Sequence, residues 1–174
     1  MSEWWTYELS DFLLFSHRVY VRLFELHNGA LWPLPLATLL IGAGIFLAVV
    51  RPGRLSGRLV PVVLGALWLW IAWSFFGVRY ATINWAAPYI AALFVLQGLA
   101  LIALAAGPGL APAGSDLRRS RRLAATAVLA LTVIGYPMLA PALGRPIAAA
   151  EVFGIAPDPT VVATLAVLAA STGR

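Results

Sequence analysis

The chain has 174 residues, of which 61% are hydrophobic and only 11% are charged. A soluble domain carries about 25% charged residues, so composition argues against a water-soluble globular fold. The absence of cysteine excludes disulfides, thiolate metal sites and cysteine nucleophiles. All twelve basic residues are arginine, and most lie in two short segments. This distribution is typical of membrane orientation rather than nucleic-acid binding, so we expect one all-α membrane domain over 1–174.

The first predicted element is an amphipathic helix over 10–28, after an acidic, aromatic N-terminus that does not have the pattern of a signal peptide. Ser10 is a good N-cap, and Asn28 followed by glycine is a good helix stop. A narrow charged stripe runs along an otherwise apolar helix, formed by Asp11, Arg18, Arg22 and Glu25. The pattern favours a helix lying in the outer membrane interface. The alternative is a helix packed against the bundle with its stripe toward water or a partner.

Four apolar runs follow, each close to the roughly 20 residues that a helix needs to cross a bilayer. We predict transmembrane helices over 34–50, 59–76, 83–106 and 123–143. A fifth run, 160–171, has about half that length. It is either a half-inserted terminal helix or the beginning of a longer one. The fold class is therefore a polytopic helical bundle with four transmembrane helices, a partial fifth and an interfacial helix.

The distribution of arginine among the loops predicts the orientation of this bundle in the membrane. The loop 51–58 holds three arginines and the loop 107–122 holds four, whereas the other two connections hold one each. Four crossings bring these two loops to the same side, and the positive-inside rule makes that side cytoplasmic. The N-terminus, the turn at 77–82 and the loop 144–158 are then periplasmic.

Three segments carry a family resemblance: "MSEWWTYELSDFLLFS", "RYATINWAAPY" and "VFGIAPDPT". Together they resemble a poorly characterised family of small bacterial multipass inner-membrane proteins. Some members of that family are labelled as transporter permeases of the major facilitator type. The resemblance implies a helical inner-membrane protein. A major facilitator has about twelve spans in two repeated halves, whereas this sequence has four or five.

The turn "FFGVRYATINWAAPY", residues 75–89, joins the second and third predicted spans. Its candidate contact residues are Arg79, Tyr80, Trp85 and Tyr89. Aromatic side chains and arginine at a span boundary are typical of anchoring in the lipid headgroup zone. The alternative is a site for a partner or an anionic ligand. Thr82 or Asn84 is expected to cap the helix that follows.

Other candidate contacts lie inside the spans. The second span carries Trp68, Trp70 and Trp73. We expect these rings to pack against a neighbouring helix or subunit, with pigment, quinone or lipid binding as the alternative. Gln97 near the middle of the third span predicts a hydrogen bond between helices.

No Asp, Glu, Lys, Arg or His lies centrally in the four spans. Proton-coupled transport and redox relays usually need such groups. His17 and His27 do not share a helix face, so a metal site is not expected, and no cofactor or catalytic residue is predicted.

We therefore expect a non-catalytic accessory or scaffold subunit of a membrane complex, in contact with lipid and with other subunits or copies of itself. A small permease or solute-binding membrane protein is the alternative.

Overall fold

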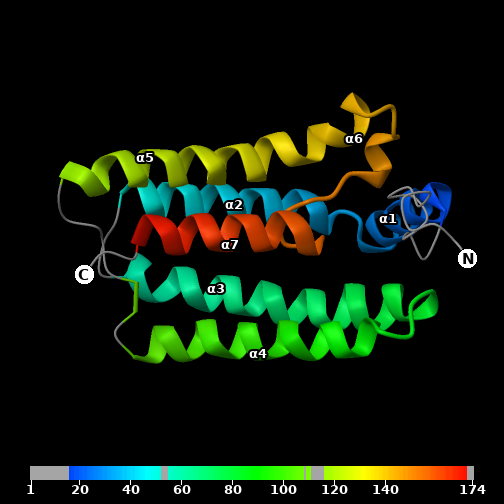
Figure 1. The fold of residues 1–174 in the computed structure, drawn as a ribbon, viewed down its shortest axis with the longest axis horizontal. Coiled ribbons are helices and arrows are strands. Elements are labelled where there is room, and N and C mark those ends of the chain that lie inside the picture. The colour runs from blue at the N-terminus through cyan, green and yellow to red at the C-terminus, as the bar shows by residue number, and fades with distance from the viewer. Residues whose placement is uncertain (1–15, 52–54, 108, 111–115, 172–174) are drawn as a thin grey trace, which may run out of the picture.

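The computed structural model describes residues 16–51, 55–107, 109–110 and 116–171. These residues form helices and their connections and contain no strand. The longer helices are α1 (His17–Leu31), α2 (Leu34–Val50), α3 (Ser56–Ile71), α4 (Ala87–Ala106), α5 (Asp116–Ala130) and α7 (Pro157–Ser171), with the short α6 (Leu139–Ala142). Helices α2, α3, α4, α5 and α7 run side by side along the long axis, and α1 lies at one end (Figure 1).

Helices α1 and α2 meet at a bend of 88°. Ser16 caps α1, because its hydroxyl oxygen accepts a hydrogen bond from the Val19 N–H at 3.4 Å. The helix continues through Asn28 and Gly29 to Leu31, so the predicted stop at Asn28 is wrong. Pro33 then cannot continue the helix, and α2 begins at Leu34. The predicted cap Ser10 lies outside the described residues.

Helix α3 continues through a π-helical segment, Ala72–Arg79, to Thr82, giving 27 helical residues in one run. Pro61 within α3 has no N–H to donate to the Gly57 carbonyl one turn earlier. That carbonyl instead accepts a hydrogen bond from the Leu110 N–H at 2.8 Å. The bond fastens the connection after α4 to the beginning of α3.

The turn between α3 and α4 differs in detail from the prediction. The Thr82 hydroxyl donates to the Arg79 carbonyl at 2.7 Å, which closes the preceding turn and does not cap α4. The Asn84 side-chain oxygen accepts from the Ala86 N–H at 2.9 Å, as in an Asx turn. Helix α4 therefore begins at Ala87, four residues later than expected, and its first turn tolerates Pro88.

The candidate span Arg119–Ala142 begins within α5 and is irregular in its second half. A π-helical segment, Leu131–Gly135, precedes a 3-10 turn, Tyr136–Met138, and the short α6. Pro137 and Pro141 account for this irregularity, since neither can donate a backbone hydrogen bond. At the opposite end, Arg122 donates to the Val50 carbonyl at 3.0 Å and so pairs with the C-terminus of α2.

Helix α7 lies in the middle of the bundle, where it contacts α2, α3 and α5 (Figure 1). It has 15 residues and is buried along much of its length. The connection from α6 to α7 runs into the bundle rather than over its surface, because every residue from 149 to 156 is buried. More than half of the segment 144–158, which the sequence places on the periplasmic side, is thus buried within the protein, and the fifth apolar run is a central element.

Helices α3 and α4 approach each other closely at two glycines. A Cβ atom on Gly98 would lie 2.9 Å from the Gly65 carbonyl oxygen, and one on Gly65 would lie 2.6 Å from the Gly98 carbonyl oxygen. Neither backbone can move away without separating the two helices. Small residues therefore determine this helix contact.

Gly98→Ala should lower the thermal stability of the purified protein in mild detergent, because the added methyl group overlaps a backbone oxygen. We expect a loss of about 1–3 kcal/mol in the free energy of unfolding. Gly44→Ala is the matched control, because a Cβ there meets nothing within 4 Å. An equal melting temperature for wild type and Gly98→Ala would contradict this helix contact.

Candidate functional site

The buried connection between α6 and α7 is the most unusual feature of the described chain. Its residues 149–156 are buried, and only part of it is helical, in the 3-10 turn Ile147–Ala149. Irregular backbone is normally found at the surface, because its N–H and C=O groups need hydrogen-bond partners. Inside this bundle, side chains provide several of those partners.

Thr160 supports the inner part of this connection. Its hydroxyl oxygen accepts a hydrogen bond from the Gly154 N–H at 2.8 Å and donates to the Ala156 carbonyl at 2.8 Å. Gly154 has a positive φ of 78°, and a Cβ there would lie 3.0 Å from the Thr38 side chain. Both conformation and space therefore require glycine at this position. The "VFGIAPDPT" segment is thus a structural unit that leads into α7.

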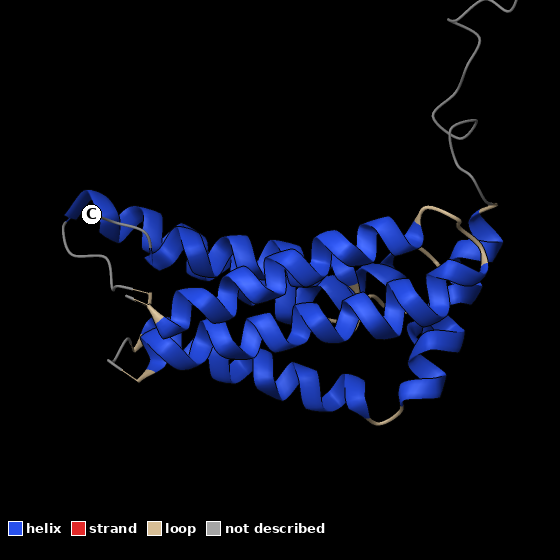
Figure 2. Ribbon diagram, turned by 90° about the horizontal axis from the view of Figure 1, so that it is seen from below, coloured by secondary structure: helices blue, strands red, loops and turns tan. Residues whose placement is uncertain are grey.

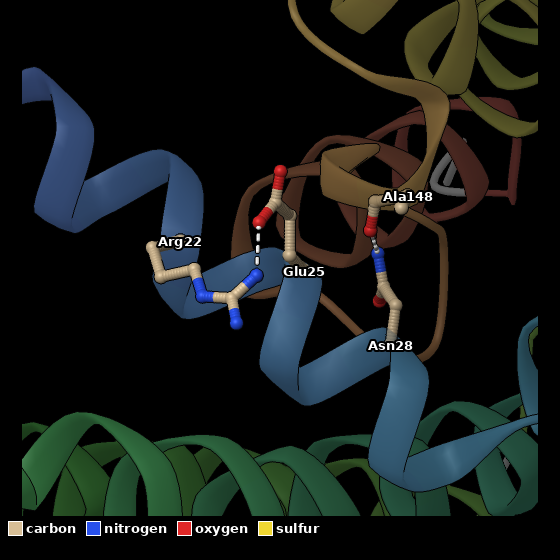
Figure 3. A network of polar contacts seen from close by, with 4 residues as sticks. All are labelled: Arg22, Glu25, Asn28 and Ala148. Carbon is tan, nitrogen blue, oxygen red and sulfur yellow. Dashed lines mark hydrogen bonds and ion pairs between the residues drawn. The ribbon is translucent and has the colours of Figure 1, made fainter.

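Asn28 of α1 supports the outer part of the same connection. Its side-chain amide nitrogen donates to the carbonyls of Ala148 and Ala150, both at 2.8 Å. Figure 3 shows the bond to Ala148 beside the Arg22–Glu25 ion pair of the same helix. Asn28 is buried, and its side-chain oxygen has no hydrogen-bond partner within the described chain. Two segments about 120 residues apart in sequence are joined in this way.

An ion pair lies within the connection itself. The Arg145 Nη1 and Glu151 Oε1 atoms are 3.5 Å apart, and the two side chains are only 12% and 9% exposed. Burial raises the pKa of Glu151, and the charge of Asp158 raises it further, whereas Arg145 opposes both effects. Breaking a buried pair by removing one partner is costly, because the other charge is left uncompensated.

His27 is a second buried ionisable group, on α1. Its side chain is 2% exposed and packs edge-to-face on Phe75, with ring centroids 5.3 Å apart. Burial lowers the pKa of His27 to about 4, and the charge of Arg79 lowers it further, against a hydrogen bond with the Ile155 backbone. The Nε2 atom has no hydrogen-bond partner in the described residues. His27 is therefore neutral at physiological pH.

The three tryptophans for which contacts were predicted lie in two different environments. Trp68 is buried, and its indole N–H donates to the Thr164 hydroxyl at 2.9 Å. The ring also packs on Phe94, with centroids 4.4 Å apart. Trp68 thus joins α3 to α7 and α4 inside one chain. Trp70 and Trp73 contact each other at 5.2 Å, and Trp73 is exposed.

The four candidate contact residues of the turn 75–89 also lie in two different environments. Tyr80 is half-buried and stacks on Phe75, with centroids 5.8 Å apart. Arg79 is half-buried, and its Nη2 donates to the Leu26 carbonyl of α1 at 3.3 Å. Trp85 and Tyr89 are exposed and contact each other, with centroids 6.2 Å apart. The structure therefore does not gather these four residues into one site.

Gln97 of α4 is half-exposed and makes no hydrogen bond to the residues that the structure describes. The hydrogen bond between helices that its position predicts is therefore not formed within this part of the chain. It lies beside the buried face of α4, which carries Phe94, Gly98 and Leu101. A mid-helix amide is thus left available to another molecule.

Sequence reasoning missed the residues that hold the interior connection, namely His27, Asn28, Arg145, Glu151 and Thr160. The sequence placed His27 on the predicted interfacial helix and Asn28 at its end. It placed Arg145 and Glu151 in the loop 144–158, and Thr160 in the fifth apolar run. The glycine in "VFGIAPDPT" was an available signal, because it lies among apolar residues that an exposed loop would not need. In the described residues, no three His, Cys, Asp or Glu side chains gather closely enough to hold a metal ion.

In its described residues the protein is thus all-helical, with three helices long and apolar enough to cross a membrane, or four if the bent α1–α2 pair is one span. A family model matches residues 17–174, and the chain belongs to that family, DUF6064, which is described as a family of unknown function. No curated protein and no solved structure matches the chain.

His27 gives a prediction about acid stability. Below its ordinary pKa of 6.5 the unfolded chain binds a proton at this histidine, whereas the folded chain does so only near pH 4. His27 therefore costs stability as the pH falls from about 6.5 to 4. The variant His27→Gln should lose less melting temperature than wild type between pH 7 and pH 4.5.

Glu151 and Asp158 have raised pKa values, which favour the folded state in acid and so act in the opposite direction to His27. Their contribution to the acid loss is the same in wild type and His27→Gln, so it cancels when the two proteins are compared. His17→Gln removes the exposed histidine and is the control; it should retain the acid loss of wild type. An identical acid loss in His27→Gln and wild type would show that His27 is not buried in a neutral form.

Proposed function

We propose that this protein is an integral protein of the bacterial inner membrane and acts as a non-catalytic accessory or scaffold subunit. In this proposal its helix α4 binds a transmembrane helix of another membrane-protein chain. The single observation that carries the proposal is Gln97, a polar side chain in the middle of an apolar helix with no partner within the described chain.

The membrane location is supported by helix length and composition. The runs Ser56–Thr82, Ala87–Ala106 and Arg119–Ala142 have 27, 20 and 24 residues, enough to cross about 30 Å of hydrocarbon. Helices α2 and α7 lie alongside them and are shorter. In the proposed arrangement α1 lies along the outer interface, since it is nearly perpendicular to α2 and exposes Arg18 and Arg22.

Helix α4 is the edge of the bundle and packs mainly on α3 (Figure 1). Most of its surface is exposed, including Leu93, one helical turn before Gln97, and its chain neighbour Leu96. A glutamine amide in lipid lacks water as a partner, so a hydrogen bond to a neighbouring helix stabilises association. This requirement favours a protein partner at the α4 face over lipid alone.

The non-catalytic role is supported by the use of the interior polar groups. Thr160, Thr164 and Asn28 hold backbone or indole groups within the chain. Glu151 is paired with Arg145. The described residues offer no nucleophile with an adjacent general base, which most catalytic sites for group transfer require.

The Gln97 contact can be tested by photo-crosslinking in cells. A photoreactive amino acid at Leu93 should crosslink to a discrete membrane protein, and Gln97→Leu should weaken that association about three- to twentyfold, the range for interhelical hydrogen bonds. Thr126→Val is the matched control, because its hydroxyl donates only to its own helix, at the Arg122 carbonyl. A crosslinked product whose yield is unchanged by Gln97→Leu would contradict this role of Gln97.

Orientation can be tested by cysteine labelling, since the natural chain has no cysteine. With the positive-inside rule, Thr82→Cys should react with a membrane-impermeant thiol reagent in intact cells, and Ser120→Cys should react only after lysis. Both positions are exposed and lie at opposite ends of the bundle. Labelling of Ser120→Cys alone in intact cells would invert the proposed topology.

A small permease is the second candidate, and the connection before α7 is the observation that favours it. Transporters often place a short helix and irregular backbone around their substrate site. Here the half-length α7 follows a buried connection that contains the Arg145–Glu151 pair. Solute flux into vesicles that contain only this protein would favour the permease over the subunit.

A further inference from the structure

A groove with a volume of about 390 Å³ lies between α1 and the end of the long helix that contains α3. Three arginines line it: Arg18 and Arg22 from α1, and Arg79 from the π-helical segment. Its apolar lining includes Leu23, Leu26 and Ile83. Charged and apolar surfaces therefore meet in one groove, built from two parts of the chain about 60 residues apart.

Among the described residues, the positive charge of this groove is only partly compensated. Arg22 pairs with Glu25 at 2.7 Å (Figure 3). Arg79 donates one bond to the Leu26 carbonyl, and its buried Nε has no partner in the described residues. Arg18 is exposed and lies one helical turn from Arg22, where like charges repel. Three guanidinium groups against one carboxylate leave an excess of positive charge that an anion would neutralise.

Arginine is well suited to a phosphate group, because its planar donors can bind two oxygen atoms at once. The groove also lies beside Thr82, where a helix long enough to cross a membrane ends. Phosphate groups of a bilayer lie at this depth. A free phosphate ion would gain nothing from Leu23, Leu26 and Ile83, whereas the glycerol and first acyl carbons of a lipid would cover them.

We propose that the groove between α1 and residues 79–83 is a binding site for an anionic phospholipid, whose phosphate contacts Arg18 and Arg79. Arg22 contributes less, because Glu25 already occupies its guanidinium. The bound lipid would hold α1 against the bundle at the bend with α2. The proposal rests on the membrane location proposed above, but not on the subunit role of α4.

The test uses the full chain, purified in mild detergent and titrated with short-chain phosphatidylglycerol, short-chain phosphatidylcholine or inorganic phosphate. Native mass spectrometry counts the bound lipid, and the shift in melting temperature reports binding independently. Wild type should bind phosphatidylglycerol at least tenfold more tightly than phosphatidylcholine. Arg18→Gln with Arg79→Gln should remove that preference.

The control variant, Arg51→Gln with Arg58→Gln, removes two exposed arginines near the opposite end and should keep the preference. Arg18→Glu is a second test variant that leaves the Arg79–Leu26 bond in place; it should weaken phosphatidylglycerol binding about tenfold while the protein stays folded.

Equal binding of the two lipids by wild type would overturn the proposal. Stabilisation by inorganic phosphate as strong as by phosphatidylglycerol would also overturn it, and would show a site for the free ion. Loss of binding in both double variants would show only nonspecific charge attraction.

Failure of the lipid test is distinguishable from failure of the proposed function. The α4 crosslink depends on Gln97 and does not involve the arginines of the groove. A protein recovered without detergent in the soluble fraction would contradict the membrane location itself, and both proposals with it.

Discussion

The interior connection between α6 and α7 imposes the strictest physical constraint on this fold, because its irregular backbone lies inside an apolar bundle and must find hydrogen-bond partners there. Thr160 meets part of that need, accepting from Gly154 and donating to Ala156. Asn28 of α1 meets another part at the carbonyls of Ala148 and Ala150. An unpaired buried polar group costs on the order of 1–3 kcal/mol, so these side chains determine where the connection can lie. Helix α7 has only 15 residues, and the connection that leads to it is buried within the same bundle.

The same constraint explains the position of α1 and the irregular helices. Asn28 can reach the connection because α1 turns 88° from α2 and lies at one end of the bundle (Figure 1). Figure 2, a view at right angles to Figure 1, shows the same long, all-helical bundle. The π-helical segment Ala72–Arg79 presents Phe75 to His27 and brings Arg79 to the Leu26 carbonyl of α1. One turn further along α7, Thr164 accepts the indole N–H of Trp68, so α3 is joined to the central helix as well. Apart from α4, which packs on α3, the long helices are thus joined through contacts to the short central helix and to the connection that leads to it.

The sequence allowed the long apolar helices to be predicted, because an apolar run of about 20 residues is a local signal. Helix α2 covers the same residues, 34–50, as the predicted span, whereas α4 begins at Ala87 because Asn84 forms a turn instead of a cap. Asn28 resembled a helix stop because asparagine before glycine often is one; its actual use depends on residues about 120 positions away. The burial of 149–156 was missed for the same reason, since only tertiary contacts distinguish an interior connection from an outer loop. The neutral His27 and the paired Glu151 likewise depend on neighbours that no local pattern reveals.

The most direct test of this account is amide hydrogen exchange at Gly154, measured by nuclear magnetic resonance on the full chain in lipid nanodiscs. The account predicts protection comparable to that of amides within α7, because the Gly154 N–H is buried and donates to Thr160. Exchange at Gly154 as rapid as at the exposed Ala148 would contradict it, and would mean that the connection lies in water instead of inside the bundle.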